Sequence, residues 1–393
     1  MVPLCEKTSR QIRPRLSPVE RLILILIPLA LMIALPATWI IVRLSHRLGA
    51  LDSAPIEGQI KADTRSIPNT GGIGIALGVL LPMIGAMGLF SILDPDAMPT
   101  VLDPIKDHVP GLRSQLPMGW TLIASILGLH VLGLIDDRKP MGPWIKLVVM
   151  LIPGAIFAIF FDTRLMTLLD SHVGGPWLSI LITILWFGVI INAMNFIDNM
   201  DGLSAGIATI AGALLLVAAL LNGQWFVGAI LALLVGSTLG FLFFNFPPAK
   251  VFMGDGGSLI LGLLLAFLTV RTTYMPIDES ASAGAWYAVL MPVVILAIPL
   301  YDFVSVTLIR VSQGKSPFVG DLQHFSHRIR DRGLGSRSTI LVIYALTLAT
   351  GISGLLISRA QPWQAAVLGI QIAALIGAIA LFEYRSPSKG TDG

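Results

Sequence analysis

Residues 176–221 read PWLSILITILWFGVIINAMNFIDNMDGLSAGIATIAGALLLVAALL. Two apolar runs, 176–195 and 203–221, flank a polar break over 192–202. Each run has about the twenty residues that an α-helix needs to cross a hydrocarbon core about 30 Å thick. Helices suit that medium because they satisfy their own backbone hydrogen bonds where water is absent. The stretch therefore predicts two membrane-spanning helices joined by a polar turn at one membrane face.

The rest of the chain repeats this alternation of apolar runs and polar breaks. Of its 393 residues, 55% are hydrophobic and 12% are charged, whereas soluble domains carry about 25% charged residues. We therefore predict an all-α, polytopic integral membrane protein with about eleven transmembrane helices. The expected spans lie near 20–43, 71–93, 118–135, 145–161, 176–195, 203–221, 224–244, 257–271, 284–309, 338–358 and 363–383. They form one transmembrane domain over 20–385, between a basic tail over 1–19 and a short tail over 386–393.

Five short polar segments interrupt the apolar sequence. They are residues 61–72 (KADTRSIPNTGG), 136–146 (DDRKPMGPWIK), 192–202 (NAMNFIDNMDG), 245–258 (NFPPAKVFMGDGGS) and 320–332 (GDLQHFSHRIRDR). Counting the expected spans between them places all five on the same face of the membrane. The sequence therefore predicts one composite site rather than five unrelated loops.

The loop charges indicate which face that is. Segment 310–337 carries six Lys or Arg residues against two Asp, whereas 94–117 carries four Asp against two basic residues. The positive-inside rule places the first segment in the cytoplasm and the second outside, so we expect a cytoplasmic composite site. By alternation of the spans, the N-terminus is then expected outside. The basic tail over 1–19 argues instead for a cytoplasmic N-terminus, which would require one span to be miscounted or to bend back. The following apolar run is too long for a signal peptide and predicts an uncleaved first helix.

Acidic residues supply the first half of the expected chemistry. Asp136 and Asp137 end one span, Asp198 and Asp201 are spaced to share a helical face, and Asp255 lies in the glycine-rich sequence FMGDGG. Charged groups at membrane depth are costly and usually functional, although the penalty is much smaller at helix ends. Five converging carboxylates would repel one another, and a divalent cation would relieve this repulsion. An all-oxygen site suits Mg²⁺, with Mn²⁺ as an alternative, and Mg²⁺ does not need every acid as a ligand.

Cationic residues on the same face supply the second half. They are Lys61, Arg65, Arg138, Lys139, Lys146, Lys250, His324, His327 and Arg328. Acids for a metal and cations for phosphate together are typical of phosphoryl transfer, which depends on positioning and charge neutralisation. Singly, each residue has a simpler interpretation, such as a loop that contacts headgroups or a solvated helix cap. It is their joint placement that favours a catalytic site.

Other classes of protein fit the sequence less well. A secondary transporter also carries acids in the membrane, but near the bilayer midplane on broken helices, whereas these acids lie at span ends. A CDP-alcohol phosphotransferase should show an Ala-Arg pair after its Asp-Gly, and the sequence after Gly202 does not. A purely structural membrane protein leaves the polar segments unexplained. Nothing indicates nucleic-acid binding, and the lone Cys5 forms no internal disulfide.

Taken together, the motifs resemble those of the polyprenyl-phosphate N-acetylhexosamine-1-phosphate transferases. The resemblance covers about 20–385, through RSIPNTGGIGI, LIDDR, NAMNFIDNMDGL, PAKVFMGDGGSLILG and DLQHFSHRI. It implies a bacterial plasma-membrane enzyme whose single catalytic domain uses Mg²⁺. The implied reaction transfers a sugar 1-phosphate from a UDP-N-acetylhexosamine to polyprenyl phosphate and releases UMP.

The last motif distinguishes branches of the family. The UDP-N-acetylmuramoyl-pentapeptide translocases show three consecutive histidines followed by Phe-Glu, whereas enzymes that use UDP-N-acetylglucosamine show a pattern similar to HxHHR. This chain has His324, Phe325, Ser326, His327 and Arg328, which is nearer the second pattern. We therefore expect N-acetylglucosamine 1-phosphate transfer, with the translocase reaction as the alternative. Ser326 departs from both patterns, because a histidine is usual at this position. The oligomeric state is a separate question, and the sequence leaves open a homodimer.

The resemblance also implies roles for the candidate residues. Asp255 would bind the metal. Asp136, assisted by Asp137, would orient or deprotonate the lipid phosphate, or Asp136 would act as a nucleophile that forms a phospho-enzyme. The pyrophosphate or the sugar would contact His324, His327 and Arg328.

The remaining candidates are expected to bind substrate. Amide and carboxylate groups would contact the nucleoside, and an aromatic ring would stack on the base. Cationic side chains would contact the lipid phosphate or the donor. The full set is Asn192, Asn195, Asp198, Asp201, Asn245, Phe252, Lys146, Lys61 and Arg65.

Overall fold

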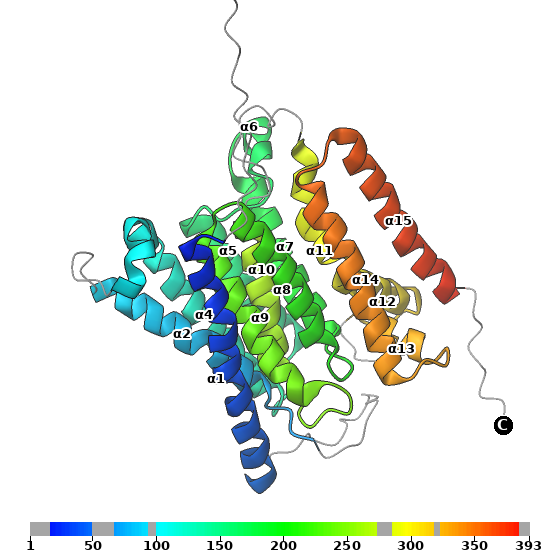
Figure 1. Ribbon diagram of the computed structural model, residues 1–393. Helices are drawn as coiled ribbons and strands as arrows, with labels where there is room; N and C mark the ends of the chain where they lie inside the picture. Colours follow the sequence, from blue (N-terminus) through cyan, green and yellow to red (C-terminus); the bar gives the residue numbers. More distant parts are fainter. Residues whose placement is uncertain (1–15, 49–66, 93–99, 273–284, 318–322, 385–393) are drawn as a thin grey trace, which may run out of the picture.

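The computed structural model describes residues 16–48, 67–92, 100–272, 285–317 and 323–384, and all secondary structure among them is helical (Figure 1). The long helices are α1 (Pro18–Leu48), α2 (Gly72–Ile92), α4 (Leu116–Asp136), α5 (Pro143–Phe160), α7 (Trp177–Phe196), α8 (Leu203–Leu221), α9 (Trp225–Asn245), α10 (Asp255–Arg271), α12 (Ala297–Ser312), α14 (Ser336–Ile357) and α15 (Pro362–Tyr384). The short ones are η2 (Thr100–His108), α3 (Val109–Ser114), η3 (Thr167–Leu169), α6 (Asp170–Val173), η5 (Ala285–Leu290), α11 (Met291–Ile295) and α13 (Phe325–Arg330). This confirms the all-α prediction.

Nine helices of the described residues are long and apolar enough to cross a membrane. The expected span over 284–309 is a bent pair, Tyr287–Ile295 and Ala297–Ser312, with 73° between its halves. Pro299 accounts for the break because it has no N–H to donate to the carbonyl of Ile295, four residues before it. The expected span over 257–271 is α10, which has 17 residues. The total of eleven crossings therefore stays a prediction.

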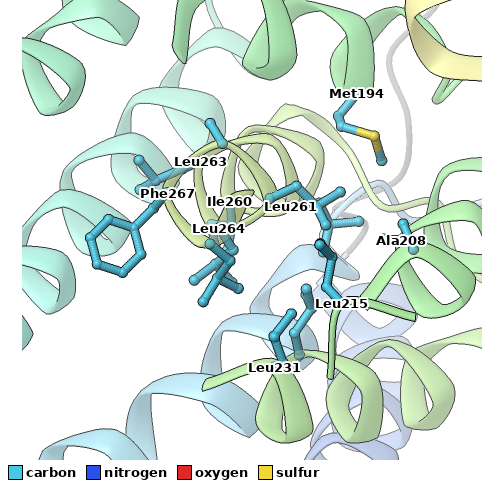
Figure 2. Close-up of a cluster of buried hydrophobic side chains, with 14 of the residues drawn as sticks. Met194, Ala208, Leu215, Leu231, Ile260, Leu261, Leu263, Leu264 and Phe267 are labelled. Carbon is cyan, nitrogen blue, oxygen red and sulfur yellow. The ribbon is translucent and has the colours of Figure 1, made fainter. Parts of the chain in front are cut away.

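Helix α10 forms the centre of the bundle. Every residue from Gly256 to Thr269 is buried, as expected for a helix that is apolar all round. In Figure 2, Leu261 of α10 lies on the side of Met194 of α7 and Leu215 of α8, and Ile260 and Leu264 lie on the side of Leu231 of α9. A Cβ added at Gly262 would come within 2.5 Å of a backbone atom of α7, so this glycine allows the two helices to pack closely.

Helices α1 and α15 lie at the edge of the bundle (Figure 1). Within the most apolar 18-residue stretch of each helix, the rest of the protein buries only 17% of α1 and 11% of α15. Most of the exposed side chains of α15 are apolar, including Val367, Ile370 and Leu381. These surfaces are suited to contact with lipid.

Candidate active site

The polar segments of the sequence meet at one end of the bundle. Gly71 N donates to Phe252 O at 3.0 Å, which joins the first segment to the fourth. Gly202 N donates to Asn245 Oδ1 at 2.8 Å, which joins the third to the fourth. Among the described residues the predicted convergence is therefore present. Lys61 and Arg65 lie outside the described residues, so their predicted roles stay untested.

Lys146 joins the ends of two helices at this site. Its Nζ contacts Asp136 Oδ2 at 2.9 Å and also forms an ion pair with Asp255 Oδ2. Asp136 ends α4, Asp255 begins α10, and Lys146 lies in the first turn of α5. The other oxygen of Asp136 accepts the backbone N–H of Met141 at 2.7 Å. The ammonium group thus offsets the repulsion between two carboxylates, and their side chains are only 14% and 25% exposed.

Asp137 follows directly, at the C-cap of α4. Its Oδ1 accepts the backbone N–H of Asp255 at 3.1 Å. Its Oδ2 is buried and has no hydrogen-bond partner among the described residues. Burial, and then the neighbouring charge of Asp255, raise the pKa of Asp137 to about 7. An electron-rich oxygen without a donor is the kind of atom that a cation or a proton would satisfy.

Asn195 contacts the same carboxylate from α7. Its Nδ2 donates to Asp255 Oδ1 at 2.8 Å and to Ser258 Oγ at 2.9 Å. Asn192, one turn earlier, instead donates to the carbonyl of Gly188 in its own helix at 2.7 Å. The structure therefore brings Asn195, but not Asn192, into hydrogen-bond contact with Asp255.

The two acids that follow α7 differ in their surroundings. Burial raises the pKa of Asp198 well above its usual range, and the charges of Asp255, Asp137 and Asp201 add to this effect. Asp201 Oδ2 instead accepts the backbone N–H of Ala249 at 2.9 Å. Asp198 therefore belongs electrostatically to the acidic cluster, whereas Asp201 also connects two loops.

Asn245 and Phe252 also connect loops. The Nδ2 of Asn245 donates to Val251 O at 2.8 Å, and its Oδ1 accepts Gly202 N, so both ends of this buried amide are used. The backbone N–H of Phe252 donates to Pro68 O at 2.7 Å, while its ring is partly exposed. The geometry gives Asn245 a structural role and leaves the predicted stacking of Phe252 untested.

The histidine motif lies on α13, where a buried acid holds it. Asp302 of α12 is fully buried, accepts a hydrogen bond from His324 Nδ1 at 2.9 Å, and accepts the backbone N–H of Phe325 at 2.6 Å. His324 Nε2 lies 3.5 Å from Arg310 Nη2, and its ring is 6.0 Å from that of Phe196 at the end of α7. Both nitrogens of His324 are thus engaged by protein groups.

Sequence reasoning missed Asp302 and counted Arg310 only as a loop charge. The available signal was an acid in an otherwise apolar run, because such residues are rare in membrane segments and usually have a partner. That partner, His324, lies 22 residues further along the chain. Spacing alone did not connect them.

His327 and Ser326 complete the motif. His327 is 2% exposed, and its Nδ1 has no hydrogen-bond partner among the described residues. Burial, and then the electrostatic influence of Arg330 and His324, lower the pKa of His327 to about 4, so it is neutral at pH 7. Ser326 Oγ donates to Asn199 Oδ1, which ties α13 to the polar loop after α7.

Sequence comparisons with known proteins indicate the family. The model of the family described as "Glycosyl transferase family 4" matches residues 119–273. A decaprenyl-phosphate N-acetylglucosaminephosphotransferase of Mycobacterium tuberculosis is 31% identical over 321 residues, which are 77% of this chain and 74% of that protein. The chain belongs to glycosyl transferase family 4.

Other relatives distinguish its branches. A Bacillus subtilis protein named "Probable undecaprenyl-phosphate N-acetylglucosaminyl 1-phosphate transferase" is 27% identical over 352 residues, 88% of each chain. A phospho-N-acetylmuramoyl-pentapeptide-transferase of Limosilactobacillus fermentum is 34% identical over 153 residues, only 37% of this chain and 48% of that protein. The likeness to N-acetylglucosaminyl 1-phosphate transferases therefore extends over far more of this family 4 chain.

The oxygen donors of the acidic cluster have the chemistry that Mg²⁺ prefers. No three Asp, Glu, His or Cys side chains among the described residues are close enough together to hold one metal ion. Mg²⁺ does not need such a cage, since it usually keeps several waters and uses one or two carboxylates together with substrate phosphates. Asp136 and Asp255 both form ion pairs with Lys146, and beside them Asp137 Oδ2 has no hydrogen-bond partner in the part of the chain that the structure describes.

Proposed function

We propose that this protein transfers N-acetylglucosamine 1-phosphate from UDP-N-acetylglucosamine to polyprenyl phosphate and releases UMP. The observation that carries the proposal is the cluster formed by Asp136, Lys146, Asp255 and Asn195, with the histidine motif on α13 at the same end of the bundle. Acids beside cations suit a diphosphate bound with a metal. The names of the two long relatives support this choice of sugar over the muramoyl-pentapeptide.

In the proposed reaction an oxygen of polyprenyl phosphate attacks the phosphorus that carries the sugar. The bond from this phosphorus to the bridging oxygen breaks, and UMP leaves with the electron pair. A phosphate monoester, with a second pKa of about 6, is already mostly ionised at neutral pH. Attack therefore needs orientation and charge neutralisation more than a general base.

The chain's own residues supply both. Asp255 would hold Mg²⁺, with the buried Oδ2 of Asp137 beside it, and the ion would disperse the charge that develops on the diphosphate oxygens. The ammonium of Lys146 adds a positive charge that is already positioned between Asp136 and Asp255. Asn195 fixes Asp255 by donating to its second oxygen. In the proposed reaction His327, whose Nδ1 has no hydrogen-bond partner among the described residues, hydrogen-bonds the donor.

The geometry favours direct transfer over a phospho-enzyme. Both oxygens of Asp136 accept hydrogen bonds, from Lys146 and from Met141. These donors stabilise the carboxylate and so reduce its nucleophilicity. Incubation with labelled donor without lipid acceptor, followed by acid quench, tests this point. Label retained on wild-type protein but not on an Asp136→Asn variant would establish the phospho-enzyme route instead.

We further propose that the site faces the cytoplasm of a bacterial plasma membrane. The arginines of 310–337 lie at this end of the bundle, in agreement with the positive-inside rule. UDP-sugars are made in the cytoplasm, so the donor would reach the site without crossing the bilayer. A Lys139→Cys variant tests the orientation. Its labelling by a thiol reagent that does not cross membranes is compared between intact cells and opened membranes.

The transferase proposal is tested with purified protein in lipid nanodiscs, Mg²⁺ and polyprenyl phosphate. UDP-N-acetylglucosamine, UDP-N-acetylgalactosamine and UDP-N-acetylmuramoyl-pentapeptide are supplied separately, and UMP and extractable labelled lipid are measured. We expect both products with the first donor, and neither with an Asp255→Asn variant. Failure of wild-type protein to release UMP from any donor, together with uptake of donor into proteoliposomes, would favour a transporter.

A further inference from the structure

The arginine of the histidine motif is held by the last helix. Arg328 Nε lies 3.1 Å from Glu383 Oε1, and Arg328 Nη2 lies 2.9 Å from Glu383 Oε2. This is a two-point guanidinium–carboxylate pair, the strongest geometry available to these groups. The two side chains are only 17% and 10% exposed. The pair joins residues 55 positions apart in the chain.

Two more of the five N–H donors of Arg328 are also used. Its Nη2 donates to Ser305 Oγ at 2.9 Å, and its Nη1 donates to the carbonyl of Gln323. Every guanidinium nitrogen of Arg328 therefore contacts a protein group. Four of its five N–H donors are thus used, so a two-point contact with pyrophosphate would require this network to open.

Glu383 organises further groups around it. Tyr301 Oη of α12 donates to Glu383 Oε2 at 2.6 Å. Arg332, just after α13, donates to the backbone carbonyl of Glu383, and its guanidinium lies 4.9 Å from the ring of Phe382. The C-terminal end of α15 is thus joined to both α12 and the α13 region.

This polar cluster accounts for how α15 is fixed at that end. Elsewhere α15 packs on α14 and exposes most of its surface (Figure 1). In lipid, apolar packing alone gives little preference for one helix position, because the tails are as apolar as the side chains. A buried ion pair with a preferred geometry supplies that preference.

We infer that Glu383 is a positioning residue of the transfer reaction, because it holds Arg328 and so fixes α13 and His327. Arg328 then acts as a clamp, meaning a residue that fixes α13 to α15, and not as a phosphate ligand. This inference rests on the proposed function, since it assigns a role within the same site. It makes the last helix, far in sequence from the acidic motifs, part of the active-site architecture.

Charge reversal distinguishes a clamp from a ligand. If Arg328 acts only through Glu383, Arg328→Glu and Glu383→Arg each lower kcat by about 30-fold or more, while KM for the UDP-sugar changes less than about threefold. The double variant then has a kcat at least about fivefold higher than that of the less active single variant, because the ion pair is re-formed with its charges exchanged. If Arg328 binds phosphate, the double variant is as inactive as Arg328→Glu, and the inference is overturned.

The milder Glu383→Gln variant, which keeps shape and loses charge, covers the case in which the reversed charges prevent folding. Hydrogen exchange is measured over 325–330 in wild type and variant. We expect faster exchange there and unchanged exchange in α10. Unchanged exchange over 325–330 together with wild-type kcat would refute the inference.

Arg330→Gln is the matched control. Arg330 lies on the same short helix, and its Nε is 3.7 Å from the exposed carboxylate of Asp331. We expect wild-type activity and wild-type exchange in this variant. The exchange measurement needs no substrate, so wild-type protein that is inactive on every donor would defeat the proposed transferase while the clamp is still tested by Glu383→Gln.

Discussion

Replacing Asp302 by asparagine is expected to lower turnover by changing which nitrogen of His324 carries the proton. Asp302 is fully buried and accepts two hydrogen bonds, from His324 Nδ1 and from Phe325 N. An asparagine can still accept from Phe325 but presents an amide N–H₂ to His324. The histidine must then move its proton to Nε2, which faces the donor group of Arg310 at 3.5 Å.

The size of the effect follows from this mismatch. One buried polar group left without a partner costs about 1–3 kcal/mol. Since about 1.4 kcal/mol corresponds to a factor of ten, we expect kcat to fall roughly 10- to 100-fold if the reacting geometry bears that cost. The helix itself should persist, because the backbone N–H at the start of α13 keeps its acceptor.

The assay measures UMP release under saturating donor and acceptor, normalised to monodisperse protein. Asp331→Asn is the control, since Asp331 follows α13 and its side chain is 68% exposed. Combining Asp302→Asn with His324→Gln should lower kcat little beyond His324→Gln alone, because both changes break the same interaction. Additive losses in the double variant, or an Asp302→Asn rate within twofold of wild type, would refute the reasoning.

Three further predictions concern the metal, packing and pH. Asp255→Asn should abolish nearly all turnover without loss of expression, and a wild-type rate at saturating Mg²⁺ would contradict its role. Gly133→Ala should lose activity, because its Cβ would overlap the backbone at the start of α10, whereas Gly128→Ala on the same helix meets nothing within 4 Å and should be neutral in the same assay. Stability should fall as pH drops from about 6.5 to about 4, because the unfolded chain protonates His327 before the folded one does. Melting curves should show a weaker fall in His327→Gln, and equal slopes would contradict the assignment.

Local patterns predicted much of the fold and the meeting of the polar segments. Apolar runs can be recognised one stretch at a time, and the spans between two polar segments can be counted. This count placed Asp136, Asp255 and Asn195 at one end of the bundle without tertiary information. The bend before α12 was missed because hydropathy is continuous across it. Pro299 marked the position, but a proline in a membrane helix does not always break it.

Partners separated in the chain were not predictable in the same way. Glu383 and Arg328 meet only because α15 returns beside α12 and α13. Asn245, expected to bind substrate, uses both ends of its amide on loop backbone. Sequence patterns indicate which residues are polar and where they cluster, but the assignment of a polar group to substrate or to scaffold depends on which neighbours satisfy it.

The spacing of the acidic cluster depends on glycines as much as on charges. A Cβ at Gly133 of α4 would overlap the backbone of Asp255 and Gly256, and a Cβ at Gly72 of α2 would overlap that of Gly257. Three helices therefore touch backbone to backbone at the start of α10. Asp136 follows Gly133 by three residues, so this close contact brings the Asp136 carboxylate within reach of the Lys146 ammonium group, which Asp255 also contacts. Repulsion between the acids opposes such an approach, and tight packing around α10 holds them together despite it.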